Sequence, residues 1–193
     1  VASLSAHFEQ AYESEAASTM ARRRFLQSLA GYSALTYLLA IKDRHNGNIM
    51  LDTHGHLIHI DFGFVLGIAP GNRFSLETAP FKLTPEMADV LGGPGAPLFE
   101  EYVHLLVECL RVARSEADTV AALIDIMAFR SRFPCFQGGL GAGAAAAFRE
   151  RLLPSVTDDG LEAAVRGLVA RAHGHRGTRL YDTFQLLTNG IAV

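Results

Sequence analysis

A short polar segment, IKDRHNGNIMLD at residues 41–52, combines side chains that can move a proton and bind phosphate. Asp43, His45 and Asn48 place a carboxylate, an imidazole and an amide close together in the chain. A second carboxylate, Asp61, follows beyond two apolar runs. Imidazole and carboxylate groups act as general bases near neutral pH, and carboxylate and amide oxygens are hard ligands of the kind that Mg²⁺ takes. These residue types predict a site for phosphate, a divalent cation and proton transfer.

Two short strands are expected to bring these groups together. IML at residues 49–51 and LIHI at residues 57–60 flank the turn-forming sequence DTHG, which is typical of a β-hairpin. Because a hairpin returns the chain beside itself, Asn48 at its entry and Asp61 at its exit are predicted to lie side by side. Gly63 is expected to let the backbone turn sharply after Asp61.

Helical periodicity dominates the rest of the chain, so the predicted fold class is mainly α (α+β). Residues 25–41 are strongly apolar, and a buried helix over about residues 21–40 is predicted to lead into the polar segment. Thr84 and Pro85 have the residue types of an N-cap and a first helical position. Ser115, together with Asp118, is predicted to cap a helix that follows it. Further helices are expected from Pro97, from the alanines of residues 138–148, over about residues 158–172, and from Thr178 with Leu180, Phe184 and Leu187 facing inward.

The order of these motifs is similar to that of protein kinases, with one difference. In protein kinases the catalytic-loop aspartate precedes a metal-binding asparagine by five residues, and Asp-Phe-Gly follows. Asp43 and Asn48 have this spacing, and residues 61–63 are Asp-Phe-Gly. The triplet here, however, is Asp-Arg-His, whereas protein kinases have His-Arg-Asp.

This inverted triplet within KDRHNGNIMLD…GHLIHIDFGF resembles the phosphoinositide 3- and 4-kinase superfamily. SLETAPFKLT at residues 75–84, PCF at residues 134–136 and TRLYDTFQLLTNGI at residues 178–191 favour its type III 4-kinase branch, of the beta kind. The resemblance implies that residues 1–193 are a partial catalytic domain. This would be the C-terminal lobe of a kinase-like fold, whose short hairpin carries the catalytic and metal-binding loops.

The resemblance also implies roles for the polar residues. The catalytic loop would lie at about residues 40–48 and the activation loop at about residues 59–84. Asp43 and His45 would lie beside the attacking inositol hydroxyl. The sequence leaves open which of the two accepts the proton of that hydroxyl.

ATP and Mg²⁺ are the cofactors that the resemblance implies. Asn48 and Asp61 would hold Mg²⁺ on the ATP phosphates. Met50 and Ile60, on the two strands of the hairpin, would form the floor under the adenine.

The charges of the expected activation loop bear on the substrate. Between Asp61 and Thr84 the only cations are Arg73 and Lys82, which are predicted to contact the headgroup. A headgroup with several phosphates needs several cations nearby, so two cations favour unphosphorylated phosphatidylinositol. The resemblance implies transfer to its 4-hydroxyl, and a cytoplasmic enzyme held peripherally on intracellular membranes, of Golgi type for example. Adaptor proteins cannot be inferred.

Overall composition excludes other classes. The net charge of −3 argues against a nucleic-acid partner, since such binding depends on a strong positive field. Residues 25–41 are apolar but shorter than a typical membrane span and interrupted by polar side chains, so a buried helix is expected. Cys109 and Cys135 lie in different segments and are expected to be free thiols of the core.

Kinase chemistry also needs a glycine-rich loop and a strand lysine, and neither is found in the sequence. We therefore expect an upstream N-lobe in the same chain as a partner, and inactivity of these 193 residues alone. A non-catalytic kinase-like interaction module, a phosphoinositide 3-kinase and a protein-serine/threonine kinase of the superfamily remain alternatives. A metal-dependent hydrolase using His54, His56, His59 and Asp61 is disfavoured, because His56 and His59 are expected on opposite faces of their strand.

Overall fold

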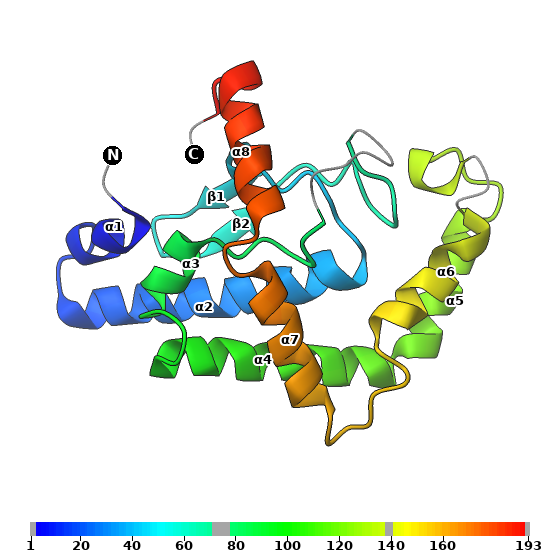
Figure 1. Ribbon diagram of the computed structural model, residues 1–193, viewed down its shortest axis with the longest axis horizontal. Coiled ribbons are helices and arrows are strands. Elements are labelled where there is room, and N and C mark those ends of the chain that lie inside the picture. The colour runs from blue at the N-terminus through cyan, green and yellow to red at the C-terminus, as the bar shows by residue number, and fades with distance from the viewer. Residues whose placement is uncertain (1–2, 71–77, 138–140, 192–193) are drawn as a thin grey trace.

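The computed structural model describes residues 3–70, 78–137 and 141–191 (Figure 1). Helices and one small antiparallel sheet make up the described fold, which confirms the predicted mainly α class with a short hairpin. The elements are α1 (Leu4–Gln10), α2 (Glu15–Leu38), η1 (Asn46–Asn48), β1 (Ile49–Leu51), β2 (Leu57–His59), α3 (Pro85–Val90), α4 (Pro97–Ser115), α5 (Ala117–Ala128), η3 (Pro134–Phe136), α6 (Gly141–Arg151), α7 (Leu161–Ala172) and α8 (Arg176–Asn189).

Helix α2 is the predicted buried helix and runs through the middle of the fold beside α4 (Figure 1). It begins at Glu15, earlier than expected, because the Ser14 side chain caps it by accepting the Ala17 N–H at 3.2 Å. Ser33 of α2 and Tyr102 of α4 join their hydroxyls at 3.0 Å inside the contact between the two helices. Among the described helices, none is both long and apolar enough to cross a membrane.

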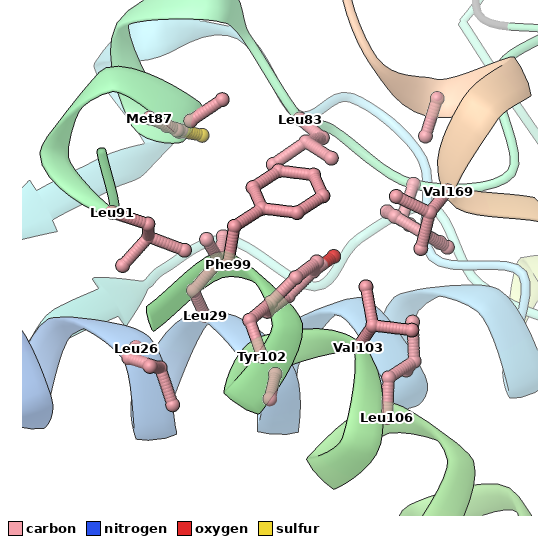
Figure 2. Packing of buried hydrophobic residues seen from close by; sticks show 14 of the residues in the cluster. Leu26, Leu29, Leu83, Met87, Leu91, Phe99, Tyr102, Val103, Leu106 and Val169 are labelled. Atoms are coloured by element: carbon pink, nitrogen blue, oxygen red, sulfur yellow. The ribbon is translucent and has the colours of Figure 1, made fainter. Parts of the chain in front are cut away.

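The main hydrophobic core lies between α2, α3, α4 and α7, as Figure 2 shows. It gathers one apolar face from each helix, and full burial of such a side chain stabilises a fold by about 1.5–3 kcal/mol. The labelled members are Leu26, Leu29, Leu83, Met87, Leu91, Phe99, Tyr102, Val103, Leu106 and Val169.

A second, smaller core joins α5, α6 and η3, with Ile124, Phe136 and Phe148 among its buried residues. The predicted cap of α5 was wrong. Ser115 is the last residue of α4, and its hydroxyl donates to the Val112 carbonyl at 2.8 Å. Its side chain therefore bonds back into the preceding helix, a competing use of short hydroxyl side chains.

The hairpin is confirmed, with Ile49 opposite His59 and Leu51 opposite Leu57. Its turn is organised by Asp52, whose Oδ1 accepts the N–H groups of His54 at 2.9 Å and His56 at 2.8 Å. Asp52 Oδ2 also lies 2.9 Å from His56 Nδ1. Partial burial opposes ionisation of this carboxyl, but the hydrogen bonds of His56 and His54 outweigh it and lower its pKa to about 2.

The hairpin rests on α2 at two points. Gly55, in the turn, has φ +93°, and a Cβ added there would come within 2.7 Å of the Ala21 carbonyl oxygen. The Leu57 N–H donates to the Ser28 hydroxyl at 2.9 Å, and Leu57 is buried. These contacts fix the position of the polar segment relative to the main core.

The start of α3 agrees with the sequence prediction. Thr84 caps α3 by accepting the Met87 N–H at 3.2 Å, with Pro85 at the first helical position. Gly190 ends α8 with φ +70°, in the left-handed conformation that favours glycine.

The predicted inward face of α8 was wrong. Leu180, Phe184 and Leu187 are 58%, 50% and 80% exposed. The buried residues of the helix are instead polar, because α8 packs against the polar segment and not against the apolar core (Figure 1).

Candidate active site

Two stretches of backbone run side by side at the site. One is the polar segment between α2 and β1, and the other follows β2. They are joined by backbone hydrogen bonds from Leu66 to Leu39 at 2.8 Å, from Lys42 to Phe64 at 2.9 Å, and from Ile60 to Asn48 at 3.0 Å. The predicted adjacency of the two ends of the hairpin is therefore present in the structure.

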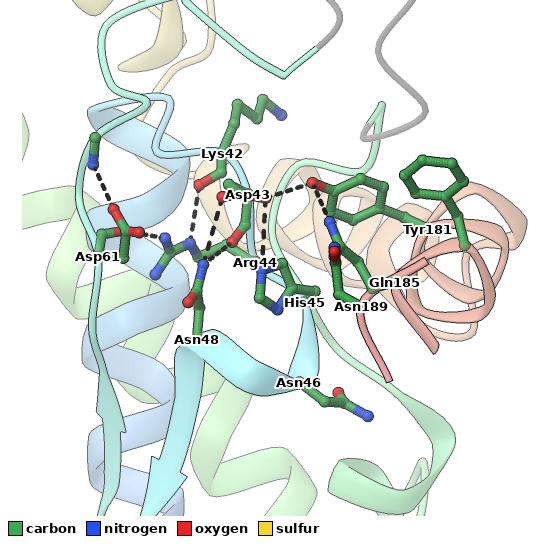
Figure 3. Close-up of polar contacts among 12 residues, drawn as sticks. Lys42, Asp43, Arg44, His45, Asn46, Asn48, Asp61, Tyr181, Gln185 and Asn189 are labelled. Atoms are coloured by element: carbon green, nitrogen blue, oxygen red, sulfur yellow. Dashed lines mark hydrogen bonds and ion pairs between the residues drawn. The ribbon is translucent and has the colours of Figure 1, made fainter. Parts of the chain in front are cut away.

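Asp43 lies at the centre of the polar segment, with its backbone in the left-handed region at φ 64°. The Asn48 Nδ2 donates to the Asp43 carbonyl at 2.9 Å and lies 3.5 Å from its carboxylate Oδ2. His45 Nε2 lies 3.8 Å from the other carboxylate oxygen, Oδ1. The structure thus brings together Asp43, His45 and Asn48, as Figure 3 shows. Their catalytic and metal-binding roles stay predictions.

Asp61 faces the same region from the segment after β2, and its side chain is exposed. Its own backbone is left-handed, at φ 57°, so the sharp turn lies at Asp61 and not at Gly63 as the sequence suggested. The Gly63 N–H donates to Asp61 Oδ1 at 3.1 Å, and a Cβ at Gly63 would come within 3.2 Å of that oxygen. Glycine at this position leaves room for the carboxylate.

Arg44 ties the two segments together. Its buried guanidinium donates to the carbonyls of Lys42 at 2.9 Å and Ile60 at 2.8 Å, and also to that of Asp61. Its carbon Cζ lies 5.5 Å from the centre of the Phe62 ring. These contacts give Arg44 a structural role, since the partners described are backbone carbonyls of the two segments.

Two histidines of the hairpin, His56 and His59, contact different residues and lie in different environments. His56 pairs with Asp52, whereas His59 is buried and stacks on Tyr32 with ring centres 4.2 Å apart. Burial, with Arg44 nearby, lowers the pKa of His59 to about 4, so this imidazole is neutral at pH 7. Among the described residues, no group of three or more histidine, cysteine, aspartate and glutamate side chains is placed to hold a metal ion.

Met50 and Ile60, the expected adenine floor, lie on the hairpin with exposed side chains. Met50 is paired with Ile58 across the strands, and Ile58 is exposed as well. The hairpin therefore presents an apolar surface to solvent. Its contact with adenine stays a prediction.

Lys82 occupies a different environment from the surface cation that the sequence suggested. Its side chain is 2% exposed, and Nζ lies 2.7 Å from both carboxylate oxygens of Asp182 and 2.6 Å from Asn46 Oδ1. A buried ammonium needs such a partner because desolvation without one is costly. Any headgroup contact by Lys82 requires this ion pair to open. Arg73, the other predicted headgroup cation, lies outside the described residues.

Helix α8 supplies site residues that sequence reasoning missed. The Tyr181 hydroxyl donates to Asp43 Oδ1, and the Asp182 carboxylate accepts the Asn46 N–H at 3.2 Å. Gln185 Nε2 donates to the Tyr181 hydroxyl at 3.1 Å (Figure 3). The only sign of this site in the sequence is that Tyr181, Asp182 and Gln185 occupy positions i, i+1 and i+4 of a helix. Such a polar group indicates a solvent-exposed helix face unless the segment that packs against it is known.

A helical lobe with an Asp-Arg-His-x-x-Asn loop, a hairpin and an adjoining Asp-Phe-Gly defines the C-terminal lobe of a kinase-like fold. Residues 2–137 match the family model described as phosphatidylinositol 3- and 4-kinase, and the chain belongs to this family. This confirms the resemblance found in the sequence.

Curated relatives agree with this assignment. Over 171 residues, which is 89% of the chain, the sequence is 45% identical to phosphatidylinositol 4-kinase beta of Homo sapiens and of Rattus norvegicus. It is 44% identical to phosphatidylinositol 4-kinase beta of Xenopus tropicalis over the same share of the chain. The match covers 20% of the human and rat proteins and 21% of the frog protein, so the chain spans about a fifth of the length of these relatives.

Proposed function

We propose that this chain forms the catalytic half-site of a longer enzyme that transfers phosphate from ATP to the 4-hydroxyl of phosphatidylinositol, giving phosphatidylinositol 4-phosphate. The observation that carries the proposal is the arrangement of Asp43, Asn48 and Asp61, which the hairpin brings to adjoining segments. The family, and relatives named phosphatidylinositol 4-kinase beta, support the choice of lipid and of hydroxyl.

The residues present fit Mg²⁺ carried on ATP. Because its NH₂ group donates to Asp43, the Asn48 amide directs its hydrogen-bond donor away from any cation and keeps its oxygen for one. The exposed Asp61 carboxylate is held by the Gly63 N–H. This is an all-oxygen donor set of the type that Mg²⁺ takes with its waters and substrate phosphates. Bound Mg²⁺ would neutralise charge on those phosphates.

Proton transfer falls to Asp43 and His45. In the proposed reaction the inositol hydroxyl oxygen forms a bond to the γ-phosphorus as the bond from that phosphorus to the ADP oxygen breaks. The hydroxyl proton passes to a base of the protein. With 3.8 Å between His45 Nε2 and Asp43 Oδ1, both groups can lie within reach of one hydroxyl, and either fits the role.

Binding of adenine and headgroup extends the proposal beyond these residues. The exposed apolar surface around Met50 and Ile60 suits a floor for adenine, roofed by an N-lobe encoded upstream. Arg73, and Lys82 where its ion pair opens, are the proposed headgroup cations. The product is a membrane lipid, so we propose peripheral association with the cytoplasmic face of intracellular membranes, of Golgi type for example. Without the N-lobe, the 193 residues are expected to be inactive.

The test compares Asp61→Asn with wild type in the full-length protein, using phosphatidylinositol vesicles, ATP and Mg²⁺. Removing one preorganised electrostatic group typically lowers the rate by about 10²–10³-fold, so we expect the variant to lose at least this much. Asp125→Asn, an exposed aspartate of α5, is the matched control and should retain wild-type rates.

The product identifies the reaction. Phosphatidylinositol 4-phosphate supports the proposal, whereas the 3-phosphate would indicate a phosphoinositide 3-kinase. Wild-type protein that phosphorylates serine or threonine residues of a peptide, but no lipid, would indicate a protein kinase. Wild-type protein without any transfer would favour the non-catalytic interaction module.

A further inference from the structure

Tyr181 reaches the centre of the site from the other end of the chain. Its side chain is largely buried, and its hydroxyl donates a hydrogen bond to Asp43 Oδ1. Behind it, Gln185 Nε2 donates to the Tyr181 hydroxyl at 3.1 Å, and Asn189 Nδ2 donates to Gln185 Oε1. Because these three residues are four apart, they lie along one face of α8 and form a hydrogen-bonded row that ends on Asp43 (Figure 3).

The Asp43 carboxylate is held at both oxygens. Tyr181 donates to Oδ1, while Asn48 Nδ2 lies 3.5 Å from Oδ2 and 2.9 Å from the Asp43 carbonyl. The Asp43 backbone is in the left-handed region, which a non-glycine residue adopts only where its surroundings determine it. The carboxylate therefore takes its orientation from α8 on one side and from the proposed metal-binding residue on the other.

The neighbouring residue anchors the helix in register. Asp182 accepts the Asn46 N–H at 3.2 Å and holds the buried Lys82 ammonium at 2.7 Å. A shift of α8 along its axis would break this buried ion pair together with the bond to Asp43. The placement of Tyr181 is therefore fixed by contacts that do not involve its own hydroxyl.

We propose that Tyr181 is a positioning residue for phosphoryl transfer: its hydroxyl orients the Asp43 carboxylate toward the attacking inositol hydroxyl, and Gln185 and Asn189 orient Tyr181. This inference rests on the proposed function. Geometry within the site has a large effect on rate, because small misplacements of a reacting group lower it strongly. Loss of the Tyr181 hydroxyl should therefore change turnover, while the ATP-binding residues remain in place.

The alternative is a purely structural role for Tyr181, in which its ring contributes packing contacts and its hydroxyl contributes nothing to the reaction. The Tyr181 ring stacks on Phe184 at 6.5 Å between centres and lies 6.2 Å from the His45 ring. Phenylalanine at position 181 keeps these ring contacts and removes the hydroxyl alone. Tyr102→Phe is the matched control, since it removes a buried tyrosine hydroxyl, bonded to Ser33 at 3.0 Å, from the core.

The experiment measures kcat, the KM for ATP and thermal stability in the full-length protein, with phosphatidylinositol vesicles as substrate. We expect Tyr181→Phe to lower kcat about tenfold with the KM for ATP within about twofold of wild type, the signature of an interaction that acts in the transition state. Gln185→Leu should also lower kcat, but by less than Tyr181→Phe does. Tyr102→Phe should lower the melting temperature and leave kcat unchanged.

Each outcome decides one proposal. An active wild type with an equally active, folded Tyr181→Phe variant overturns the positioning role and leaves the proposed function standing. A wild type that transfers no phosphate to lipid overturns the proposed function and the positioning role with it. If Tyr181→Phe and Tyr102→Phe both lose activity only in proportion to their loss of folded protein, Tyr181 is structural.

Discussion

At the scale of single residues, two aspartates of the site share an unusual backbone conformation. Asp43 has φ 64° and Asp61 has φ 57°. Aspartate tolerates the left-handed region better than most residues because its short side chain can bond locally, but the conformation still costs on the order of 1 kcal/mol. Arg44 bonds to the carbonyl of Asp61 and to that of Lys42 beside Asp43, so one buried side chain supports the backbone next to both carboxylates.

Asp52 offers a pH test at the same scale. Because its pKa in the folded protein is about 2, below the ordinary 3.8, its ionised form stabilises the fold fully above about pH 4. This contribution is lost as the pH falls from 3.8 toward 2. We expect Asp52→Asn to have a lower melting temperature than wild type at pH 6, and this difference to shrink between pH 4 and pH 2. A difference that stays constant over this interval would contradict the assigned shift.

The sequence could predict that Asp43, His45 and Asn48 lie together and that Asp61 faces the same region, because the contacts that place them are between neighbouring parts of the chain. A hairpin of two short strands determines which residues face each other, and its turn residues are legible in the sequence. The adjacency of the segments that carry Asn48 and Asp61 follows from the strand register alone. Tyr181 could not be found in this way, since 138 positions separate it from Asp43.

At the scale of elements, α8 shows why helix existence is easier to predict than helix orientation. Its end at Gly190 follows from local backbone chemistry. Its buried face was assigned to Leu180 and Phe184 on the assumption that apolar residues point inward. That assumption fails where a helix packs on a polar loop, because the buried face must then supply hydrogen-bond partners such as Asp182.

The environment of Lys82 was predicted wrongly because its partner, too, is distant in the sequence. In sequence it is one of two cations in a long irregular segment, which suggests a solvent-facing charge. Asp182, which takes it into the interior, lies 100 positions later in the chain. Lys82 and Asp182 bond to each other and both bond to Asn46, so the residues just before α3, the polar segment and α8 meet at one buried ion pair.

The contact of the hairpin with α2 gives a prediction about elements. Alanine at position 55 would have to adopt φ +93° and place its Cβ within 2.7 Å of the Ala21 carbonyl oxygen. We expect Gly55→Ala to lower the free energy of unfolding by at least about 2 kcal/mol, as measured by urea unfolding.

Gly31→Ala is the matched control for this change. Gly31 lies within α2, and a Cβ there would meet nothing within 4 Å. Alanine is the better helix former, so this variant should gain about 0.5–1 kcal/mol. Equal effects of the two substitutions would show that the hairpin does not press on α2 as described.

At the scale of the whole molecule, two hydrophobic clusters must be held in one arrangement. The larger contains the faces of α2, α3, α4 and α7, and the smaller contains those of α5 and α6. The described polypeptide between α6 and α7 passes from one cluster to the other (Figure 1). The sequence of this connection, residues 152–160, has no regular period of apolar residues and contains one proline, Pro154. It does not predict how the connection is held in place.

Arg114, in the last turn of α4, fastens this connection. Its guanidinium donates to the carbonyls of Leu152 at 2.9 Å, Leu153 at 2.6 Å and Val156 at 2.9 Å, and lies 3.1 Å from Asp158 Oδ1. We expect Arg114→Met, which keeps an unbranched apolar stem, to destabilise the connection by about 2–4 kcal/mol, because several carbonyls lose a charged donor together.

Hydrogen–deuterium exchange in the full-length protein measures this effect where it arises, in residues 152–160. The variant should exchange these amides faster, with α2 and α4 nearly unchanged, since the connection can open without the main core. Arg111→Met is the control: that arginine is exposed and pairs with Glu108 one turn earlier in the same helix, so its loss should change stability by less than about 0.5 kcal/mol. Protection of residues 152–160 that is equal in Arg114→Met and wild type would show that the packing of the two clusters, and not Arg114, holds the connection.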